Sequence, residues 1–558
     1  MSASEYLTRM RAAKYASTSM YSGSRNSRRG GTSQDPSESR LVVNNAGAKQ
    51  VYALDNMKRA TRFLILGSQG GTYYQTQPEL TAENASALVE LISSPQWKEL
   101  VDLIVDVSVK GRAAKQQPTM FALALACRLG DLDVRRYAFS KLSEVCRIPT
   151  HLFMFIGYME SFKGDGRGTG WGKLSRRAIA AWYNDKDVAK LARFVTKYQN
   201  REGWTHKDVL SLAHVKPIDD PHSSLYKYVV NGEIPADQVF TEYLSAVAIA
   251  KTEGVPEEDI LGFISSFRLE REHLHTSYLS SVPIWTALLK NMGLTAMIRN
   301  LGKMTATGLF QPLSETEKQV VDALCDTESL KRQRVHPFSI LVALHQYKKG
   351  CGARGSLSWS PNQRIVAALD KAFYASFGNV ASTNKNILIG MDVSGSMGWG
   401  DINGVPGMTP LVAASAMVLL TLKTEEPNVH TYAFCDRFVP WGVNSSMDLD
   451  GVMSSCNGLS FGRTDCALPM IYAKDHKIPV DTFIIYTDCE TWAGRVTPAQ
   501  SLRDYRRAMN RPHAQLIVVA MTSSGFTIAD PEDPGMLDVV GFDTSAPEVM
   551  RQFMAGEL

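Results

Sequence analysis

The chain has 558 residues, of which 44% are hydrophobic and 21% are charged. This length exceeds what one hydrophobic core usually supports, so two to four domains are expected, and the composition excludes a chain that is disordered throughout. No apolar run reaches the ~18 residues that a membrane span needs, and no secretory signal opens the sequence, so neither a membrane protein nor a secreted one is expected.

The near-neutral total of 60 Lys and Arg against 56 Asp and Glu hides two oppositely charged parts. Residues 386–558 carry 11 Lys and Arg against 20 Asp and Glu, a net charge of −9, and residues 1–385 carry 49 against 36, a net charge of +13. Such an asymmetry indicates that the basic part meets a polyanion and that the acidic part has another role. The eight cysteines form no CxxC pair, which indicates free thiols in a reducing compartment, so we expect a cytoplasmic protein.

Residues 1–50 are expected to form a flexible basic N-terminal tail. The segment 22–35 is rich in Ser, Gly, Arg and Asn and shows no periodicity that would bury one face. Two interpretations stay open for this tail: a solvated N-terminus, and a basic arm that touches nucleic acid.

Residues 51–385 have a helical period. Apolar side chains recur at the spacing of one helix face, for example at Trp97, Leu100, Val101 and Ile104. A similar stripe follows Pro283, a residue that suits the first turn of a helix. Because strand-like alternation is almost absent and each helix can bury only one face, we expect these helices to stack in pairs, as in helical-repeat proteins.

A stripe of cations lies in the middle of this helical part. The segment 187–201 is predicted to be one helix closed by Gly203, and four cations share one of its faces: Lys190, Arg193, Lys197 and Arg201. Six further basic or histidine side chains lie close by in the sequence: Lys173, Arg176, Arg177, His206, Lys207 and His214. Like charges on one face repel each other, and a bound polyanion removes that cost. Cations interleaved with aromatic and histidine side chains suit single-stranded RNA, whereas the alternative interpretation is a solvated face.

Two other segments are candidates for phosphate binding. Lys110, Arg112 and Lys115 form a further basic cluster in a predicted loop. The Gly-rich loop 164–172 superficially resembles a phosphate-binding loop, but it lacks the required positions for Gly and for Ser or Thr. We therefore expect a basic loop there and no site of nucleotide hydrolysis.

The pattern changes at about residue 386. Four short apolar runs, at 386–392, 429–434, 482–486 and 516–520, alternate with helix-like stretches such as 409–422. Buried strands that alternate with helices predict a parallel α/β sheet, with ligands at the carboxyl ends of the strands.

Oxygen-bearing side chains follow two of these strands. Asp392, Ser394 and Ser396 come directly after the first strand, and Thr464 and Asp488 lie near the ends of later elements. Carboxylate and hydroxyl oxygens are hard ligands, so we expect one divalent cation, Mg²⁺ in the first place, with Ca²⁺ or Mn²⁺ as alternatives. The pattern is that of a metal-ion-dependent adhesion site, and the segment resembles a von Willebrand factor A domain. Serines that cap a strand-to-helix turn are the alternative interpretation.

No catalytic residue is predicted for this site. A metal-dependent hydrolase needs an added general base, and His430, His476 and His513 fall into no paired-ligand spacing. Binding, not catalysis, is the expected role.

Five longer segments of the sequence form distinctive motifs: RFLILGSQGGTYY (62–74), SEVCRIPTHLF (143–153), RNLGKMT (299–305), GRTDCALPM (462–470) and TSSGFTIADP (522–531). These segments resemble motifs of the Ro autoantigen family, the RNA-binding proteins with a TROVE module. The resemblance covers residues 50–555, with the helical and the α/β parts in the same order. It implies a ring of HEAT-like helical repeats, residues 51–385, closed by a von Willebrand A-like domain, residues 386–558.

The resemblance also implies partners and site residues. In the family, single-stranded 3′ ends of misfolded noncoding RNAs thread a basic hole, and Y RNAs bind the outer surface. The residues of the hole and its rim carry over onto Lys197, Arg201 and His214, and the five metal-site residues carry over without a substitution. The Gly-rich loop 164–172 departs from the family pattern, which puts its contacts in doubt.

We therefore expect a non-enzymatic ribonucleoprotein scaffold for noncoding-RNA quality control or processing. Its expected partners are Y-like small noncoding RNAs, the 3′ ends of misfolded RNAs and a 3′-to-5′ exoribonuclease, with no membrane partner and a monomeric ring. The alternative is a metal-dependent protein-adhesion or chaperone-associated module whose basic surface is incidental. A nuclease is a third possibility, and it requires RNA shortening by the pure protein.

Overall fold

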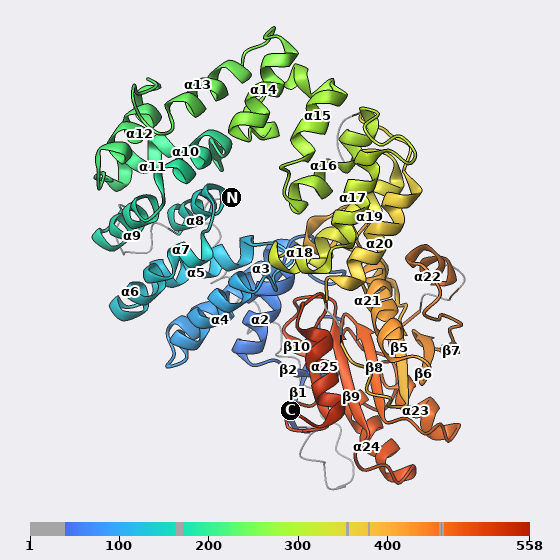
Figure 1. Cartoon of the computed structure of the whole chain (residues 1–558). Coiled ribbons are helices and arrows are strands. Elements are labelled where there is room, and N and C mark those ends of the chain that lie inside the picture. Colours follow the sequence, from blue (N-terminus) through green and yellow to red (C-terminus); the bar gives the residue numbers. More distant parts are fainter. Residues whose placement is uncertain (1–38, 163–170, 353–355, 378–379, 457–458, 460–461) are drawn as a thin grey trace. The chain divides into compact units, whose positions relative to one another are not determined.

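The structure is a computed structural model of the chain, and it describes residues 39–558 except 163–170, 353–355, 378–379, 457–458 and 460–461 (Figure 1). The basic tail segment 22–35 and most of the Gly-rich loop 164–172 lie outside the described residues. The chain forms two compact units. We call them the α/β unit, made of the described residues up to 91 with 112–118 and 377–558, and the helical unit, made of 92–111 and 119–376.

The α/β unit is built on a six-stranded sheet with the strand order β11-β9-β8-β5-β6-β7. The strands are β5 (Ile387–Asp392), β6 (Val429–Phe434), β7 (Phe438–Pro440), β8 (Thr482–Thr487), β9 (Gln515–Ala520) and β11 (Met536–Val540). All neighbours are parallel except β6 and β7. The four predicted strands are confirmed as β5, β6, β8 and β9. The sequence pattern missed β7 and β11, because β7 is very short and β11 has Asp538 at its centre.

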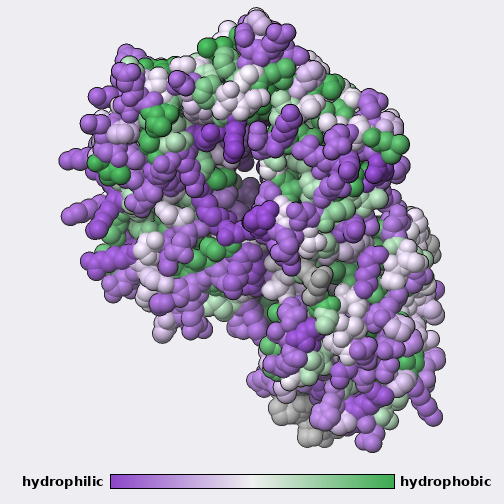
Figure 2. Space-filling model, viewed as in Figure 1, coloured by the Kyte–Doolittle hydropathy of each residue, from purple (hydrophilic) through white to green (hydrophobic). Residues whose placement is uncertain are grey.

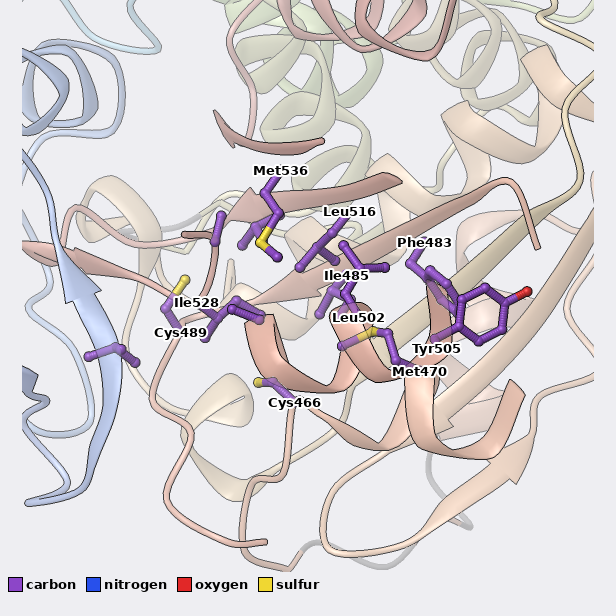
Figure 3. Close-up of a cluster of buried hydrophobic side chains, with 14 of the residues drawn as sticks. Cys466, Met470, Phe483, Ile485, Cys489, Leu502, Tyr505, Leu516, Ile528 and Met536 are labelled. Carbon is purple, nitrogen blue, oxygen red and sulfur yellow. The ribbon is translucent and has the colours of Figure 1, made fainter. Parts of the chain in front are cut away.

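Helices cover both faces of this sheet, which explains why β5 and β8 are buried at every residue. Alternate side chains of a strand point to opposite faces. On one face, Phe483, Ile485 and Leu516 pack against α23 (Leu468–Asp475) and α24 (Pro498–Ala508) (Figure 3). On the other face, the Tyr486 hydroxyl contacts α21 (Pro410–Glu425), the helix predicted at 409–422. Thr409 caps α21 by accepting a hydrogen bond from the Val412 N–H. Two further helices of the unit are α22 (Leu449–Cys456) and α25 (Ala546–Ala555).

The N-terminal part of the described chain belongs to the α/β unit, which corrects the prediction of a tail up to residue 50. The strands β1 (Leu41–Val43) and β2 (Lys49–Ala53) form an antiparallel sheet with β10 (Phe526–Thr527). Leu41, Val51 and Tyr52 are buried in the same core cluster as the large sheet. A local sequence pattern cannot predict this pairing, because β10 lies far from β1 and β2 in the sequence.

The helices α2 (Asn56–Leu66) and α3 (Gln77–Ile92), predicted in the helical domain, pack mainly in the α/β unit as well. The guanidinium of Arg62, on α2, is fully buried and donates hydrogen bonds to the carbonyls of Ser524 and Phe526 and to the carboxylate of Asp538. A buried cation needs such partners, so α2 is an integral part of the α/β unit. The compact helical unit therefore begins at residue 92, not at residue 51.

The helical unit consists of short helices that pack on their neighbours. They are α4 (Trp97–Val109), α5 (Gln117–Leu129), α6 (Leu132–Ser140), α7 (Leu142–Val145), α8 (Pro149–Ser161), α9 (Lys173–Asn184), α10 (Val188–Lys197), α11 (His206–Ala213), α12 (Asp220–Asn231), α13 (Thr241–Ala250), α14 (Glu257–Phe267), α15 (Val282–Leu289), α16 (Leu294–Ala306), α17 (Glu315–Cys325), α18 (Thr327–Arg332), α19 (Pro337–Lys349) and α20 (Gln363–Ala375). Helix pairs such as α13 with α14, α14 with α15 and α19 with α20 are in contact. The predicted stack of amphipathic helices is confirmed, with Leu100, Val101 and Ile104 buried on α4 and Pro283 in the first turn of α15. The closure of a ring stays a prediction.

Candidate metal site and basic surface

Four of the five predicted metal-site residues, Asp392, Ser394, Ser396 and Asp488, lie at the carboxyl ends of β5 and β8. Asp392 ends β5, and its Oδ1 accepts a hydrogen bond of 2.9 Å from the Ser394 N–H. The hydroxyls of Ser394 and Ser396 lie 3.1 Å apart, and the Ser396 hydroxyl donates to Asp488, the residue after β8. The backbone carbonyl of Thr464 accepts a hydrogen bond from the backbone N–H of Trp492, which ties the Thr464 segment to the loop after Asp488. The parallel sheet thus brings distant oxygen groups to one edge.

This cluster fits a cation because it holds two carboxylates that are buried away from solvent. Asp392 and Asp488 are 0% and 2% exposed. Burial, together with repulsion from Asp488, raises the pKa of Asp392, and burial also raises that of Asp488. A divalent ion among them would offset both effects. In the described part of the chain there is no cluster of three or more His, Cys, Asp and Glu with metal-site geometry, so a bound ion would depend on the hydroxyls.

The sequence analysis missed one hydrogen-bond partner in this cluster, Thr487, whereas Glu490 was expected to be an acid near the site without binding the cation. The Thr487 hydroxyl donates a hydrogen bond of 2.6 Å to Asp392 Oδ2 and so orients the carboxylate. Glu490 is 2% exposed and accepts a hydrogen bond of 2.8 Å from the side chain of Asn45 and another from the Ala46 N–H. The turn between β1 and β2 therefore holds the loop that follows Asp488. The TDCE sequence at 487–490 signals an acidic loop, but nothing local in the sequence signals the contact with Asn45.

The predicted basic helix is shorter than expected, and Arg201 lies outside it. The helix α10 is capped by Asp187 and ends at Lys197. Arg201 lies in β3 (Asn200–Arg201), which pairs with β4 (Trp204–Thr205) through a turn at Glu202 and Gly203. Both turn residues have positive φ, 53° and 79°, as a tight two-residue hairpin requires. Gly203 is a hairpin residue and not a helix cap, so only Lys190, Arg193 and Lys197 share the helix.

Three of the predicted RNA-binding cations already have contacts within the helical unit. The Lys197 ammonium forms an ion pair with Glu270, and the Arg201 Nε lies 3.2 Å from the Glu202 carboxylate. Arg193 donates to the carbonyl of Phe267. An incoming phosphate would have to compete with these partners.

His206 is not available to a ligand, which corrects the prediction that it contacts RNA. Its side chain is 3% exposed, and it hydrogen-bonds with the Tyr183 hydroxyl at 2.8 Å and with the Tyr198 carbonyl at 3.1 Å. Burial lowers the pKa of His206 to about 4, so the imidazole is neutral. A histidine at the first position of α11 that faces the core cannot be told apart from an exposed one by composition alone.

The other predicted side chains are accessible, on α9, α10, α11 and the hairpin between α10 and α11. Seven are exposed, namely Lys173, Arg176, Arg177, Lys190, Arg201, Lys207 and His214, and Arg193 and Lys197 are half-buried. Figure 2 shows that the viewed face of the helical unit is mostly hydrophilic, with hydrophobic side chains in small separate groups. Helices α9 and α11 pack on each other, as do α10 and α12. The helical unit therefore presents a concentration of cations on neighbouring elements.

The three basic residues at 110–115 make contacts with other residues of the protein. Arg112 forms a two-bond ion pair with Asp543, with Nε–Oδ1 and Nη2–Oδ2 distances of 3.0 and 2.7 Å. Lys115 donates to the side chain of Gln69, and Lys110 pairs with Asp106. These cations lend no support to the prediction of an RNA-binding surface.

The fold and these sites define a class of two-part protein: a stack of helices with an accessible basic surface, joined to a von Willebrand A-like unit with an acidic and hydroxyl-rich cluster at the sheet edge. The TROVE domain family matches residues 42–245 and 268–385, and the Ro60 vWA domain family matches residues 386–554. The chain belongs to the Ro60 family of TROVE-domain proteins.

Two known proteins and one crystal structure are similar to the chain over most of its length. It is 38% identical over 528 residues to the RNA-binding protein RO60 of Deinococcus radiodurans, which covers 93% of this chain and 96% of that protein. It is 34% identical over 590 residues to the RNA-binding protein RO60 of Caenorhabditis elegans, covering 93% and 90%. The crystal structure of the Deinococcus radiodurans RO (RSR) protein matches with a TM-score of 0.67 at 38% identity, over 90% of this chain and 100% of that one.

Proposed function

We propose that the chain is an RNA-binding scaffold of a ribonucleoprotein and that the cations on α9, α10 and α11 contact the RNA backbone. The concentration of exposed Lys and Arg on these neighbouring helices carries the proposal. The two relatives that bear the name RNA-binding protein RO60 support it. Phosphates contact such cations in every RNA sequence, so affinity depends strongly on salt.

The proposal extends to the kinds of RNA and to protein partners. We propose Y-like small noncoding RNAs and the single-stranded 3′ ends of misfolded RNAs as ligands, with a 3′-to-5′ exoribonuclease as the enzyme that acts on them. The protein itself binds without cleaving, and it acts as a monomer in the cytoplasm. Eight free cysteines, six of them buried, support a reducing compartment. Among the described residues, no helix has both the length and the apolar character that a membrane span requires.

We further propose that Asp392, Ser394, Ser396, Thr464 and Asp488 hold one divalent cation, Mg²⁺ in the first place. When bound, the ion supplies positive charge that keeps both carboxylates ionised, and it offers a coordination position to an oxygen of a partner. The chain's own residues orient the site: Thr487 and the Ser394 N–H fix the two oxygens of Asp392.

The RNA proposal is tested by fluorescence anisotropy with a labelled single-stranded oligouridylate. The triple variant Lys197→Ala, Arg201→Ala, His214→Ala is expected to bind at least ~10-fold more weakly, because each lost hydrogen bond costs about 0.5–1.5 kcal/mol. The matched control changes the same residue types on the α/β unit: Lys474→Ala, Arg507→Ala, His476→Ala. Equal binding by the two variants would refute the assignment of this surface.

The buried carboxylate cluster favours one rival function, a metal-dependent protein-adhesion module with an incidental basic surface. The two proposals differ in what co-purifies with the protein. Sequencing of nucleic acid from the purified particle is expected to yield discrete small RNAs. A particle free of RNA, together with protein binding that Asp392→Ala abolishes, would support the rival.

A further inference from the structure

Two indole rings from separate segments lie side by side in the helical unit. Trp171 comes just before α9, and Trp204 lies on β4 of the hairpin between α10 and α11. Their ring centroids are 6.0 Å apart, and the ring planes meet at 44°. Both side chains are half-buried, so part of each residue is accessible to solvent. We call Trp171 and Trp204 the tryptophan pair.

The protein holds both rings in place before any ligand binds. The indole N–H of Trp171 donates a hydrogen bond of 2.8 Å to Glu160 Oε1 on α8. Trp204 pairs with Arg201 across the hairpin, and both strands of the hairpin pack on α8. A Cβ at Gly157 on α8 would lie 3.9 Å from Trp204 Nε1, which is an ordinary packing distance. A ligand that stacks on such fixed rings loses little affinity to the ordering of side chains.

Exposed cations flank the tryptophan pair. Lys173 lies two residues after Trp171, and Arg176 follows one turn later on α9. Arg201 is the register partner of Trp204 in the hairpin. All three cations are exposed, and all three belong to the surface that we assign to the RNA backbone. The pair therefore lies among groups that attract phosphate.

Two carboxylates near the pair each have a guanidinium beside them. The Glu202 carboxylate lies 3.2 Å from the Nε of Arg201. Burial lowers the pKa of Arg128, and the nearby carboxylate of Glu160 opposes that shift. With both acids accompanied by arginine, the exposed cations on α9 give the neighbourhood of the pair a positive balance of charge.

The combination of flat rings and cations matches the two parts of a nucleotide. Every base has a π face that stacks on an aromatic side chain, and the phosphates on either side of it attract Lys and Arg. Duplex RNA keeps its bases stacked inside the helix, so only an unpaired nucleotide can offer such a face. Trp also contributes strongly to protein interfaces, but a surface rich in Lys and Arg favours a polyanion.

We propose that the tryptophan pair is a stacking site for an unpaired base of the bound RNA, with Lys173, Arg176 and Arg201 holding the flanking phosphates. This inference rests on the proposed RNA function, and it adds a means of selecting unpaired nucleotides over duplex. Because stacking strength grows with ring area, the site prefers purines to pyrimidines.

The test compares two labelled ligands of equal length and charge by fluorescence anisotropy: an oligoadenylate and an abasic ribose–phosphate chain. The unchanged protein is expected to bind the oligoadenylate about 10-fold more tightly, which is the order that one stacked base contributes. Trp171→Ala, Trp204→Ala should lose this preference and bind the abasic chain as before. Trp171→Phe, Trp204→Phe keeps two rings and should keep most of the preference. Trp399→Ala, at a 49% exposed site of the α/β unit, is the control and should change neither affinity.

Three outcomes would overturn the proposal: equal affinity of the unchanged protein for the two ligands, unchanged oligoadenylate binding by the Ala variant, or an equal loss of both ligands in that variant. The second of these would leave a protein as the partner of the tryptophan pair. Failure of the RNA function itself looks different, because the unchanged protein would then bind neither ligand. The Lys197, Arg201, His214 variant keeps both rings, so it is expected to weaken both ligands and to retain the preference for bases.

Discussion

Glu270 forms an ion pair with Lys197 at the end of α10, so a carboxylate of the protein already contacts a cation that we assign to RNA binding. The Lys197 side chain is 19% exposed and that of Glu270 is 41% exposed, which leaves the pair within reach of a ligand. Hydrogen bonding to Glu270 raises the pKa of Lys197 despite the opposing effect of its burial, so this lysine stays charged.

Removal of this competing carboxylate is expected to strengthen RNA binding. Glu270→Gln should lower the Kd for an oligouridylate about 2- to 5-fold, which corresponds to the ~0.5–1 kcal/mol of an exposed ion pair. Glu272→Gln is the matched control, because Glu272 acts on Lys197 at longer range. Anisotropy titrations of both variants check this. An equal gain from both would show that general charge, and not the ion pair, limits affinity.

The dependence of RNA affinity on salt should report the number of cations in contact. For single strands the slope of log K against log salt is about −0.7 for each neutralised phosphate. Lys197→Ala, Arg201→Ala should therefore make the slope shallower by about 1.4, if each residue contacts one phosphate. Filter binding over a salt series measures it. An unchanged slope with weaker binding would mean that these residues act without touching phosphate.

Mg²⁺ is expected to stabilise the protein through the cluster at Asp392 and Asp488. An ion that binds only the folded state adds about 2.7 kcal/mol at ~100 times its Kd, and it should raise Tm in a thermal melt against EDTA. Asp392→Asn should abolish this response. The same variant should melt higher than the unchanged protein in EDTA, because one of two buried repelling carboxylates is gone. Asp475→Asn, at an exposed site of the same unit, is the control.

The N-terminal helix α2 should be essential for the stability of the α/β unit. Arg62→Met leaves Asp538 without its buried cation, and the loss is expected to be about 3–5 kcal/mol. Lys58→Met, on the exposed face of the same helix, should change stability by less than about 0.5 kcal/mol. Urea unfolding followed by circular dichroism compares them. Adding Asp538→Asn to Arg62→Met should recover part of the loss, whereas no recovery would contradict the pairing.

Acid should destabilise the helical unit through its buried histidines. Burial lowers the pKa of His206 to about 4 and that of His273 to about 3. In the unfolded chain both groups take up protons at about pH 6.5, so the folded state loses stability as pH falls below that value. His206 alone accounts for about 3 kcal/mol between pH 6.5 and 4. His206→Gln should be less stable at pH 7.5 and should lose less stability on acidification, and parallel pH profiles would contradict this.

Local sequence patterns were sufficient to predict the strands and helices whose burial follows from their own residues. The strands β5, β6, β8 and β9 are buried apolar runs, and α4, α15 and α21 follow from their periodicity and first-turn residues. The metal-site candidates could be named because parallel strands must end at a common edge, and Asp392, Ser394, Ser396 and Asp488 lie there. The family motifs pointed to both parts of the chain.

The errors come from a local turn that was read as helix and from contacts between distant segments. Arg201 was placed on α10 because its spacing fits a helix, but Tyr198 ends that helix and the turn at Glu202 and Gly203 reverses the chain. His206 was counted as a ligand because its burial depends on Tyr183, on another helix. Arg112 was counted as a free cation because its partner, Asp543, is far away in the sequence.

The sequence by itself determined the order of the elements, the charge of each part and the residue types that can meet RNA or a cation. These follow from side-chain periodicity and composition, which act over a few neighbouring residues. Only the tertiary structure decided which cations are accessible, that the strands at 41–53 belong to the α/β unit, and that the rings of Trp171 and Trp204 lie side by side. Burial and pairing are properties of contacts, and contacts between remote segments exist only once the chain has folded.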